Sequence, residues 1–462
     1  MKTKYILSAC LLSCSMTAIS QGLHSGYFVD DLKTRHTMNP AIANDQSYVA
    51  IPGIGNLNIK SMGNFGVGDV LFDNPLYGIT SDKKKTTFMN PYITGATDGF
   101  KDINRIRVQE NISILSAGFK AFNGYNTVEL NVRSDVNAKL PFELFAFAAN
   151  QENRHYDIGE INVAAKSFAE LVLGHSRQVG DKLRLGGKLK ILLGIAEGNA
   201  DITHVTADLQ DANRWILNAQ AEANISMKGF KYVSETKEYK STGSSYTRVK
   251  DVDVDGTGIG GFGAGVDLGA LYKINEDWEV SAALLDLGFI SWSNQMVARN
   301  DGKPFEFSGF HDIDVNDKTS PTGMETQGHK YSDQIADFYN LKDKGDQGGR
   351  TTSLSPVFTV GGKYTLPSYR LLSLGLLSTT QLGKFIWTEA RLSANISPLK
   401  WLDGGLSFAV NTYTTSMGWV LNIHPRSYNF FIGMDHLLGK CTKEMIPLSS
   451  NASLSLGMSI TW

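Results

Sequence analysis

Two aspartates, Asp267 and Asp286, are the residues whose spacing most clearly indicates chemistry. Each begins an Asp-Leu-Gly triplet, and the triplets flank a turn predicted at 275–277. A hairpin centred between 276 and 277 would place the two carboxylates opposite each other, with Cβ atoms about 4.5–5.5 Å apart. Like charges at that distance are unfavourable, so either one carboxyl group is protonated or a cation lies between them. The two interpretations are an ion-pair network with neighbouring lysine and arginine residues, and a proton or cation site on a permeation path.

A second acidic group could bind a metal ion. Asp251, Asp253 and Asp255 offer oxygen ligands at alternate positions before Gly256, as at the start of a calcium loop. The pattern then fails, because Phe262 stands at the twelfth position, where a bidentate glutamate belongs. The group is a weak calcium candidate, with an acidic external loop as the alternative, and the sequence predicts no cofactor.

Signatures of enzymes are absent from the sequence. It contains no G-x-S-x-G, H-E-x-x-H or paired C-x-x-C motif. The nine histidines are scattered, and the nearest candidates for a serine–histidine pair, His424 and His436, are interpreted as interface or loop residues. The chain is therefore predicted not to be an enzyme. Its net charge of −2 also gives no indication of nucleic-acid binding.

The elements that would position these residues are β-strands with one apolar and one polar face. In 452–462, apolar residues occupy every even position, and serine, glycine or threonine every odd position. Segments 183–193 and 214–227 alternate in the same way but carry charges on the polar face, among them Arg184, Lys188 and Lys190. A row of charges needs partners in a dry core, whereas a water-filled lumen accommodates it and lipid accommodates the apolar face. A soluble sandwich with its charged face turned to bulk water is the alternative.

The spacing of the strands predicts an all-β fold, a transmembrane antiparallel β-barrel of roughly 14–16 strands. Short connections alternate with long gaps, and the three longest gaps are 229–257, 293–353 and 437–450. Outer-membrane barrels have short periplasmic turns and longer external loops. No run of about 18 apolar residues follows the N-terminal segment. Aromatic residues near predicted strand ends fit interfacial girdles: Trp215, Trp292, Trp401, Tyr428 and Trp462.

The N-terminus carries a targeting segment. Lys2 and Lys4 precede an apolar stretch that ends in a cleavage site at 18–20, so residues 1–20 are predicted to be a cleaved signal peptide. Its removal leaves Cys441 as the single thiol. Residues 21–47 lack a regular period and are predicted to form a plug inside a barrel made by 48–462. The predicted location is the cell outer membrane of a Gram-negative bacterium, surrounded by outer-membrane lipid.

Several stretches resemble known outer-membrane families. Asn39-Pro40-Ala41, shortly after the signal peptide, resembles the N-terminal plug of the long-chain fatty-acid-transporter class of barrels. Segments 49–55, 188–196, 283–292 and 397–402 are similar to pieces of an uncharacterised outer-membrane family (a domain of unknown function) related in pattern to that class. The resemblance implies a plugged barrel and carries no activity. The last strand, closing on Trp462, resembles the terminal strand recognised for insertion, which implies the barrel-assembly machinery as a partner.

Two functional hypotheses follow from this architecture. The first is a passive channel for small hydrophobic molecules. By the resemblance, a ligand enters from the external loops, and displacement of the plug around Asn39-Pro40-Ala41 opens a route. The alternative is a non-transporting barrel whose external loops, especially 293–353, bind a partner or anchor a surface or secretion complex. A ligand-sized apolar pocket behind the plug would favour the first hypothesis.

Overall fold

The computed structural model describes residues 22–73, 86–211, 214–309, 314, 316–437 and 450–462, and the structural statements below refer to these residues. The predicted signal peptide, 1–20, and Cys441 lie outside them.

The main body is a closed antiparallel barrel of 14 strand positions. The first position is divided between β1 (Tyr48–Ala50) and β2 (Leu57–Gly63), on either side of Pro52. β1 and β2 pair with the last strand, and Tyr48 lies opposite Thr461 and Leu57 opposite Leu456. The other positions are β5 (Ile103–Ala121), β6 (Gly124–Pro141), β7 (His155–Val179), β8 (Leu183–Asp211), β12 (Gly261–Lys273), β13 (Trp278–Trp292), β18 (Val357–Thr365), β19 (Leu372–Gln381), β20 (Trp387–Leu399), β21 (Leu402–Asn411), β22 (Thr415–Ile423), β23 (Tyr428–Met434) and β24 (Ala452–Thr461).

The alternation of the sequence sets the two faces of this wall. On β8, Leu189 and Ile191 are 65% and 53% exposed, whereas Lys188 and Lys190 between and beside them are buried. The exposed apolar residues of β19 to β22 follow the same period of two, which leaves an apolar outer face of the kind that contacts lipid. The predicted transmembrane barrel is confirmed, and the chain is a barrel of the outer-membrane type.

The strand count differs from the upper prediction of sixteen for two reasons. The residues after the predicted strand segment 183–193 do not begin a new strand, because β8 continues without a break to Asp211. Segment 214–227 forms β9 (Arg214–Met227), which pairs with the outer part of β8 and with no other strand of the closed ring, and therefore lies outside it. The inner part of β8 pairs with β12 instead, between Leu183 and Gly194.

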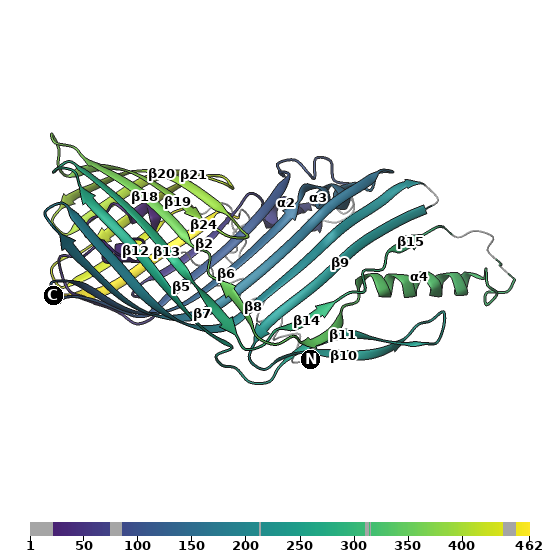
Figure 1. Cartoon of the computed structure of the whole chain (residues 1–462). Coiled ribbons are helices and arrows are strands. Elements are labelled where there is room, and N and C mark those ends of the chain that lie inside the picture. Colours follow the sequence, from purple (N-terminus) through teal and green to yellow (C-terminus); the bar gives the residue numbers. More distant parts are fainter. Residues whose placement is uncertain (1–21, 74–85, 212–213, 310–313, 315, 438–449) are drawn as a thin grey trace.

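The outer parts of β7 and β8, together with β9, continue beyond the ring as a sheet that we call the outer extension (Figure 1). A strand crosses a membrane in about 9–11 residues, and β8 has 29. The predicted long loop 293–353 is largely folded, and two of its strands pair with β9. The remaining elements are α2 (Val67–Val70), β3 (Leu71–Asp73), β4 (Thr86–Phe88), α3 (Phe142–Ala149), β10 (Phe230–Glu238), β11 (Ser245–Val254), β14 (Met296–Arg299), β15 (Phe305–Phe307), α4 (Met324–Tyr339), β16 (Lys342–Asp346) and β17 (Arg350–Ser353).

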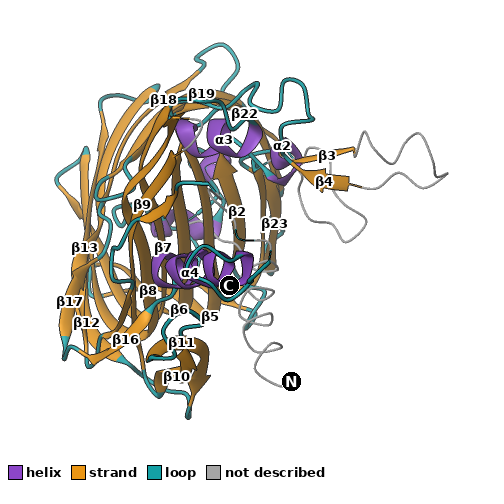
Figure 2. Cartoon of the chain, turned by 90° about the vertical axis from the view of Figure 1, so that its right-hand side faces the viewer, coloured by secondary structure: helices purple, strands orange, loops and turns teal. Residues whose placement is uncertain are grey.

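Figure 2 shows the curved wall of strands with α3 and α4 at the end that faces the viewer, the outer end in Figure 1. Among the described helices, none is long and apolar enough to cross a membrane. The opposite end carries the short turns, including 180–182 and 274–277, and is therefore the periplasmic end.

Candidate functional site: the plugged lumen

Residues 22–47 fill the lumen as a plug. It contains two short 3₁₀ helices, η1 (His24–Gly26) and η2 (Lys33–Thr37), and most of its side chains are buried against the wall. Asp435, just after β23, accepts hydrogen bonds from the backbone N–H groups of His24 (3.1 Å) and Ser25 (2.7 Å). The carboxylate thus satisfies two otherwise free amides at the start of η1 and fixes the plug to the wall.

The wall is shaped to this plug by glycines that face inward. A Cβ atom at Gly186 or Gly269 would overlap Pro40 or Asn39, and one at Gly375 would overlap the ring of Phe28. Glycine in a strand weakens it and marks a close approach of another segment. The wall therefore gives up local strand stability to seat the plug closely.

The predicted plug motif lies at the centre of this contact. Asn39 is fully buried, and its Nδ2 donates to the Tyr27 hydroxyl (3.1 Å) and to the backbone oxygens of Ala270 and Ala282 (3.3 Å each). Its Oδ1 accepts from the Ala41 amide at 2.9 Å. One amide side chain therefore joins two parts of the plug to both β12 and β13.

A first ion-pair group links the plug to the wall through His36. Lys188 Nζ donates to Glu129 (2.6 Å) and to His36 Nδ1 (3.1 Å). Because an ammonium can only donate, Nδ1 acts as the acceptor and Nε2 carries the proton toward the Tyr48 hydroxyl at 2.6 Å. Burial lowers the pKa of His36 below its usual value, and the Lys188 ammonium lowers it further, against the opposing effect of Glu129. The neutral imidazole is the form that fits.

Acidification is expected to loosen the plug through His36. A released plug exposes an ordinary histidine with a pKa of about 6.5, whereas the docked His36 has a lower one. The docked state therefore loses stability as the pH falls below about 6.5 toward the docked pKa. Single-channel recordings between pH 7.5 and 5 should show more frequent openings at low pH, and a flatter profile for His36→Gln. The exposed His175 provides the control His175→Gln, and identical profiles for His36→Gln and the natural chain would contradict the idea.

The second group contains the two predicted aspartates. Lys190 Nζ lies 2.8 Å from Asp267 and 2.5 Å from Asp286. Arg133 binds Asp286 at 2.7 Å and Glu170 at 3.2 Å. The cation between the carboxylates is therefore a lysine ammonium, which is the geometry of the ion-pair interpretation.

A β-bulge brings Asp286 into this group. Val266 pairs with Leu287 and Leu268 with Leu284, so two residues of β13 face Asp267 alone. Asp286 adopts a left-handed φ of 58°, and its N–H donates to Asp267 Oδ1 at 2.7 Å. Strict alternation along β13 predicts Leu285 on the outer face with Leu287 and Phe289, and this prediction is wrong. The bulge turns Leu285 inward, where it is 3% exposed.

The other predicted residues lie elsewhere. Arg184 makes no ion pair with described residues and is near Asp45 at the periplasmic end, apart from the group around Lys190. Trp292 was wrongly placed in a girdle: it is buried and donates to Thr352 at 2.9 Å. Trp462 is 65% exposed at the end of β24, and its role in insertion stays a prediction.

The calcium candidate forms no ligand cluster in the described structure. Asp251 and Asp253 lie in β11, a strand of the β10–β11 hairpin whose pairing has a register shift next to Asp251, and Asp255 follows β11 at 3.5 Å from Lys231. Residues two apart in a strand are separated by about 7 Å along the chain, too far for three carboxylates to share one ion without a turn.

A partly enclosed cavity of about 530 Å³ lies on the outer side of the Lys190 group, and Arg133 and Asp286 form part of its lining. Other lining residues carry charges of both signs, including Lys166, Glu197 and Arg350. Deeper in the lumen, the space beside Tyr27 and Met38 is only about 10 Å³. That space is too small to hold a ligand.

The sequence profile of a family of unknown function (DUF5723) matches residues 40–435. The chain belongs to this family. A search of the curated proteins found no match.

Solved structures match most of this chain at low sequence identity. The toluene transporter TodX of P. putida matches with 10% identity and a TM-score of 0.42, over 92% of each chain. The toluene transporter TbuX of Ralstonia pickettii matches with 8% identity and a TM-score of 0.39, over 93% of this chain and 92% of that one. The translocator domain of the autotransporter NalP of Neisseria meningitidis matches with 9% identity and a TM-score of 0.32, over 91% and 89%.

Proposed function

We propose that the protein is a passive outer-membrane channel that is closed by its own plug. The observation that carries the proposal is the tight seating of residues 22–47 between two open spaces. One is the 530 Å³ outer cavity, and the other is a hollow of about 450 Å³ at the periplasmic end, lined in part by Asp31, Trp401 and His424. Displacing the plug would join these spaces through a lumen with charged walls.

The lining of the outer cavity suggests the kind of solute. Lys166 and Arg350 each lie within 3.3 Å of Glu197, so a solute entering here meets both charges and hydrogen-bond donors. A small polar or zwitterionic solute can exchange water for these groups, whereas a hydrocarbon cannot. The proposal therefore begins with a small polar solute. Passage of a hydrophobic molecule stays a prediction, and Phe168, Leu354 and Phe385 give the same cavity apolar surface.

Deleting residues 22–46 is the direct test. We expect the purified deletion variant to form a steadily open pore in planar bilayers, while the full chain opens rarely. The matched control removes 230–254, an external hairpin of equal length whose ends adjoin, since the Asp255 N–H donates to the Gly229 oxygen at 2.8 Å. An equally open pore before and after deletion of the plug would refute the gate.

The second candidate function is attachment of an external partner, and the outer extension favours it. The extension presents a folded surface with β10, β11 and α4 beyond the length needed to cross a bilayer. The pull-down would compare the full chain with a variant that lacks 230–254. Capture of a partner by the full chain alone, together with no liposome swelling of the full chain in sugars or amino acids, would favour attachment over transport.

A further inference from the structure

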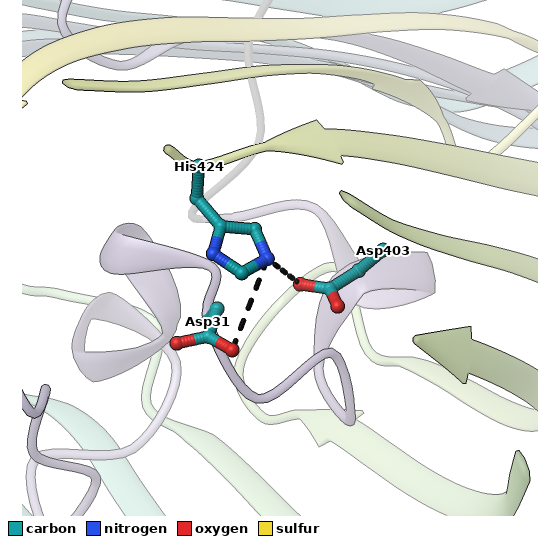
Figure 3. Close-up of side chains that lie close together, drawn as sticks. All are labelled: Asp31, Asp403 and His424. Carbon is teal, nitrogen blue, oxygen red and sulfur yellow. Dashed lines mark ion pairs between the residues drawn. The ribbon is translucent and has the colours of Figure 1, made fainter. Parts of the chain in front are cut away.

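A cluster of three side chains at the periplasmic mouth is not needed for the seating or the gating described above. Asp31 lies in the plug between η1 and η2, Asp403 lies on β21, and His424 directly follows β22. Figure 3 shows the imidazole directed between the two carboxylates. His424 Nε2 is 2.8 Å from Asp403 Oδ2 and 3.8 Å from Asp31 Oδ2.

The wall positions two of these side chains firmly. Asp403 pairs with Asn422 across β21 and β22, and Asn422 Nδ2 donates to its carboxylate at 3.0 Å. The backbone N–H of His424 donates to the backbone oxygen of Trp401 at 2.8 Å, and Pro425 follows. A hydrogen bond behind a ligand, such as that from Asn422 to Asp403, orients the ligand and is typical of metal sites.

The direction of the His424 ring is the second observation. Its side chain is only 9% exposed, and Nε2 forms an ion pair with Asp403 at 2.8 Å and faces Asp31 at 3.8 Å. The same ring nitrogen is therefore shared by both carboxylates (Figure 3). A divalent cation between the nitrogen and the two oxygens would replace the proton of this ion pair.

We infer that Asp31, Asp403 and His424 bind one divalent transition-metal ion of the zinc type. The three donor atoms lie within 4.8 Å of one another, and donors around tetrahedral zinc at about 2.0–2.1 Å from the metal are roughly 3.3 Å apart. Two carboxylates and a neutral imidazole also balance a charge of +2. One nitrogen and two oxygens suit zinc or cobalt better than calcium, which takes six to eight oxygens.

The site is open to the periplasm on one side. Asp31 is 44% exposed, and with His424 it lines the 450 Å³ hollow. A hydrated ion can therefore enter, and water can fill the remaining coordination positions. Because Asp31 belongs to the plug and the other two ligands to the wall, a bound ion would fasten the plug, a consequence that rests on the proposed gated channel.

Binding is measured on the full chain, purified in detergent without a histidine tag. Isothermal titration with ZnCl₂ should give one ion per chain, CaCl₂ should give none, and Co²⁺ should produce visible absorption bands. His424→Asn and Asp31→Asn should each weaken zinc binding at least about tenfold and remove the cobalt bands. The control is His155→Asn, because His155 lies 3.9 Å from a single carboxylate, Asp208, in an exposed pair.

Absence of stoichiometric zinc binding, or unchanged binding in both site variants, would overturn the site. Asp31→Asn keeps the test decisive if His424→Asn fails to fold, since Asp31 lies on a part-exposed turn. Zinc should also reduce channel openings severalfold in the natural chain and not in Asp31→Asn. If deletion of 22–46 leaves the conductance unchanged, the proposed gating by the plug is refuted. The zinc titration of the full chain still tests the metal site independently.

Discussion

Replacing Lys190 by methionine is expected to destabilise the barrel by about 3–5 kcal/mol. The ammonium lies between Asp267 and Asp286, and all three side chains are 6% exposed or less. Methionine fills the volume but leaves two neighbouring carboxylates, of which Arg133 contacts only Asp286. Breaking a buried group of charges by removing one partner leaves an uncompensated buried charge. Reversible guanidinium unfolding of the protein in lipid vesicles would measure the free energy of unfolding.

A matched control exists on the surface. Lys384 forms an ion pair with Asp201 at 2.6 Å, but its side chain is 51% exposed. Lys384→Met should therefore cost less than about 1 kcal/mol. Adding Asp267→Asn to Lys190→Met should restore part of the loss, because it removes one unpaired charge. If Lys190→Met and Lys384→Met lowered the free energy of unfolding equally, the buried position of Lys190 between the two aspartates would contribute nothing to stability.

Gly375→Val is expected to expel the plug. A Cβ atom there would overlap the ring of Phe28, which is itself buried in the cluster that joins plug and wall. Inserting atoms into such a contact costs typically about 1–3 kcal/mol, and here the plug can leave instead of adapting. We expect a more open channel in bilayer recordings of the full chain.

The sign of the effect on stability should reverse when the plug is removed. In a chain that lacks 22–46, valine at 375 meets no plug and supplies a better strand former than glycine, worth about 0.5–1 kcal/mol. Gly362, where a Cβ would meet nothing within 4 Å, gives the control Gly362→Val. Destabilisation by Gly375→Val of the same size with and without the plug would contradict a steric cause.

Much of the barrel could be predicted because the alternation has a direct physical cause. Lys188 and Lys190 face inward and Leu189 outward as their parity requires. The first strand position is interrupted at Pro52, which cannot donate a hydrogen bond to a neighbouring strand. Each of these follows from local residue types.

The errors arose where a partner strand, and not the segment itself, decides the structure. Segment 214–227 alternates like a barrel strand, yet β9 lies outside the ring because β8 changes its partner from β12 to β9 near Gly194. The bulge at Asp286 reverses the parity of Leu285, and nothing in the local sequence marks it. The Asp31–Asp403–His424 cluster joins positions that only the closed barrel brings together.

The pairing of β1 with β24 has a consequence for assembly. It joins Tyr48 to Thr461, almost the whole chain apart, and the Trp462 N–H donates to the oxygen of Ser47, the residue where the plug ends. Contacts between such distant positions carry a large loop-closure entropy and are expected to form late. The N-terminal segment must therefore already lie in the lumen when β1 pairs with β24. The plug is thus enclosed during biogenesis and is not inserted into a completed barrel.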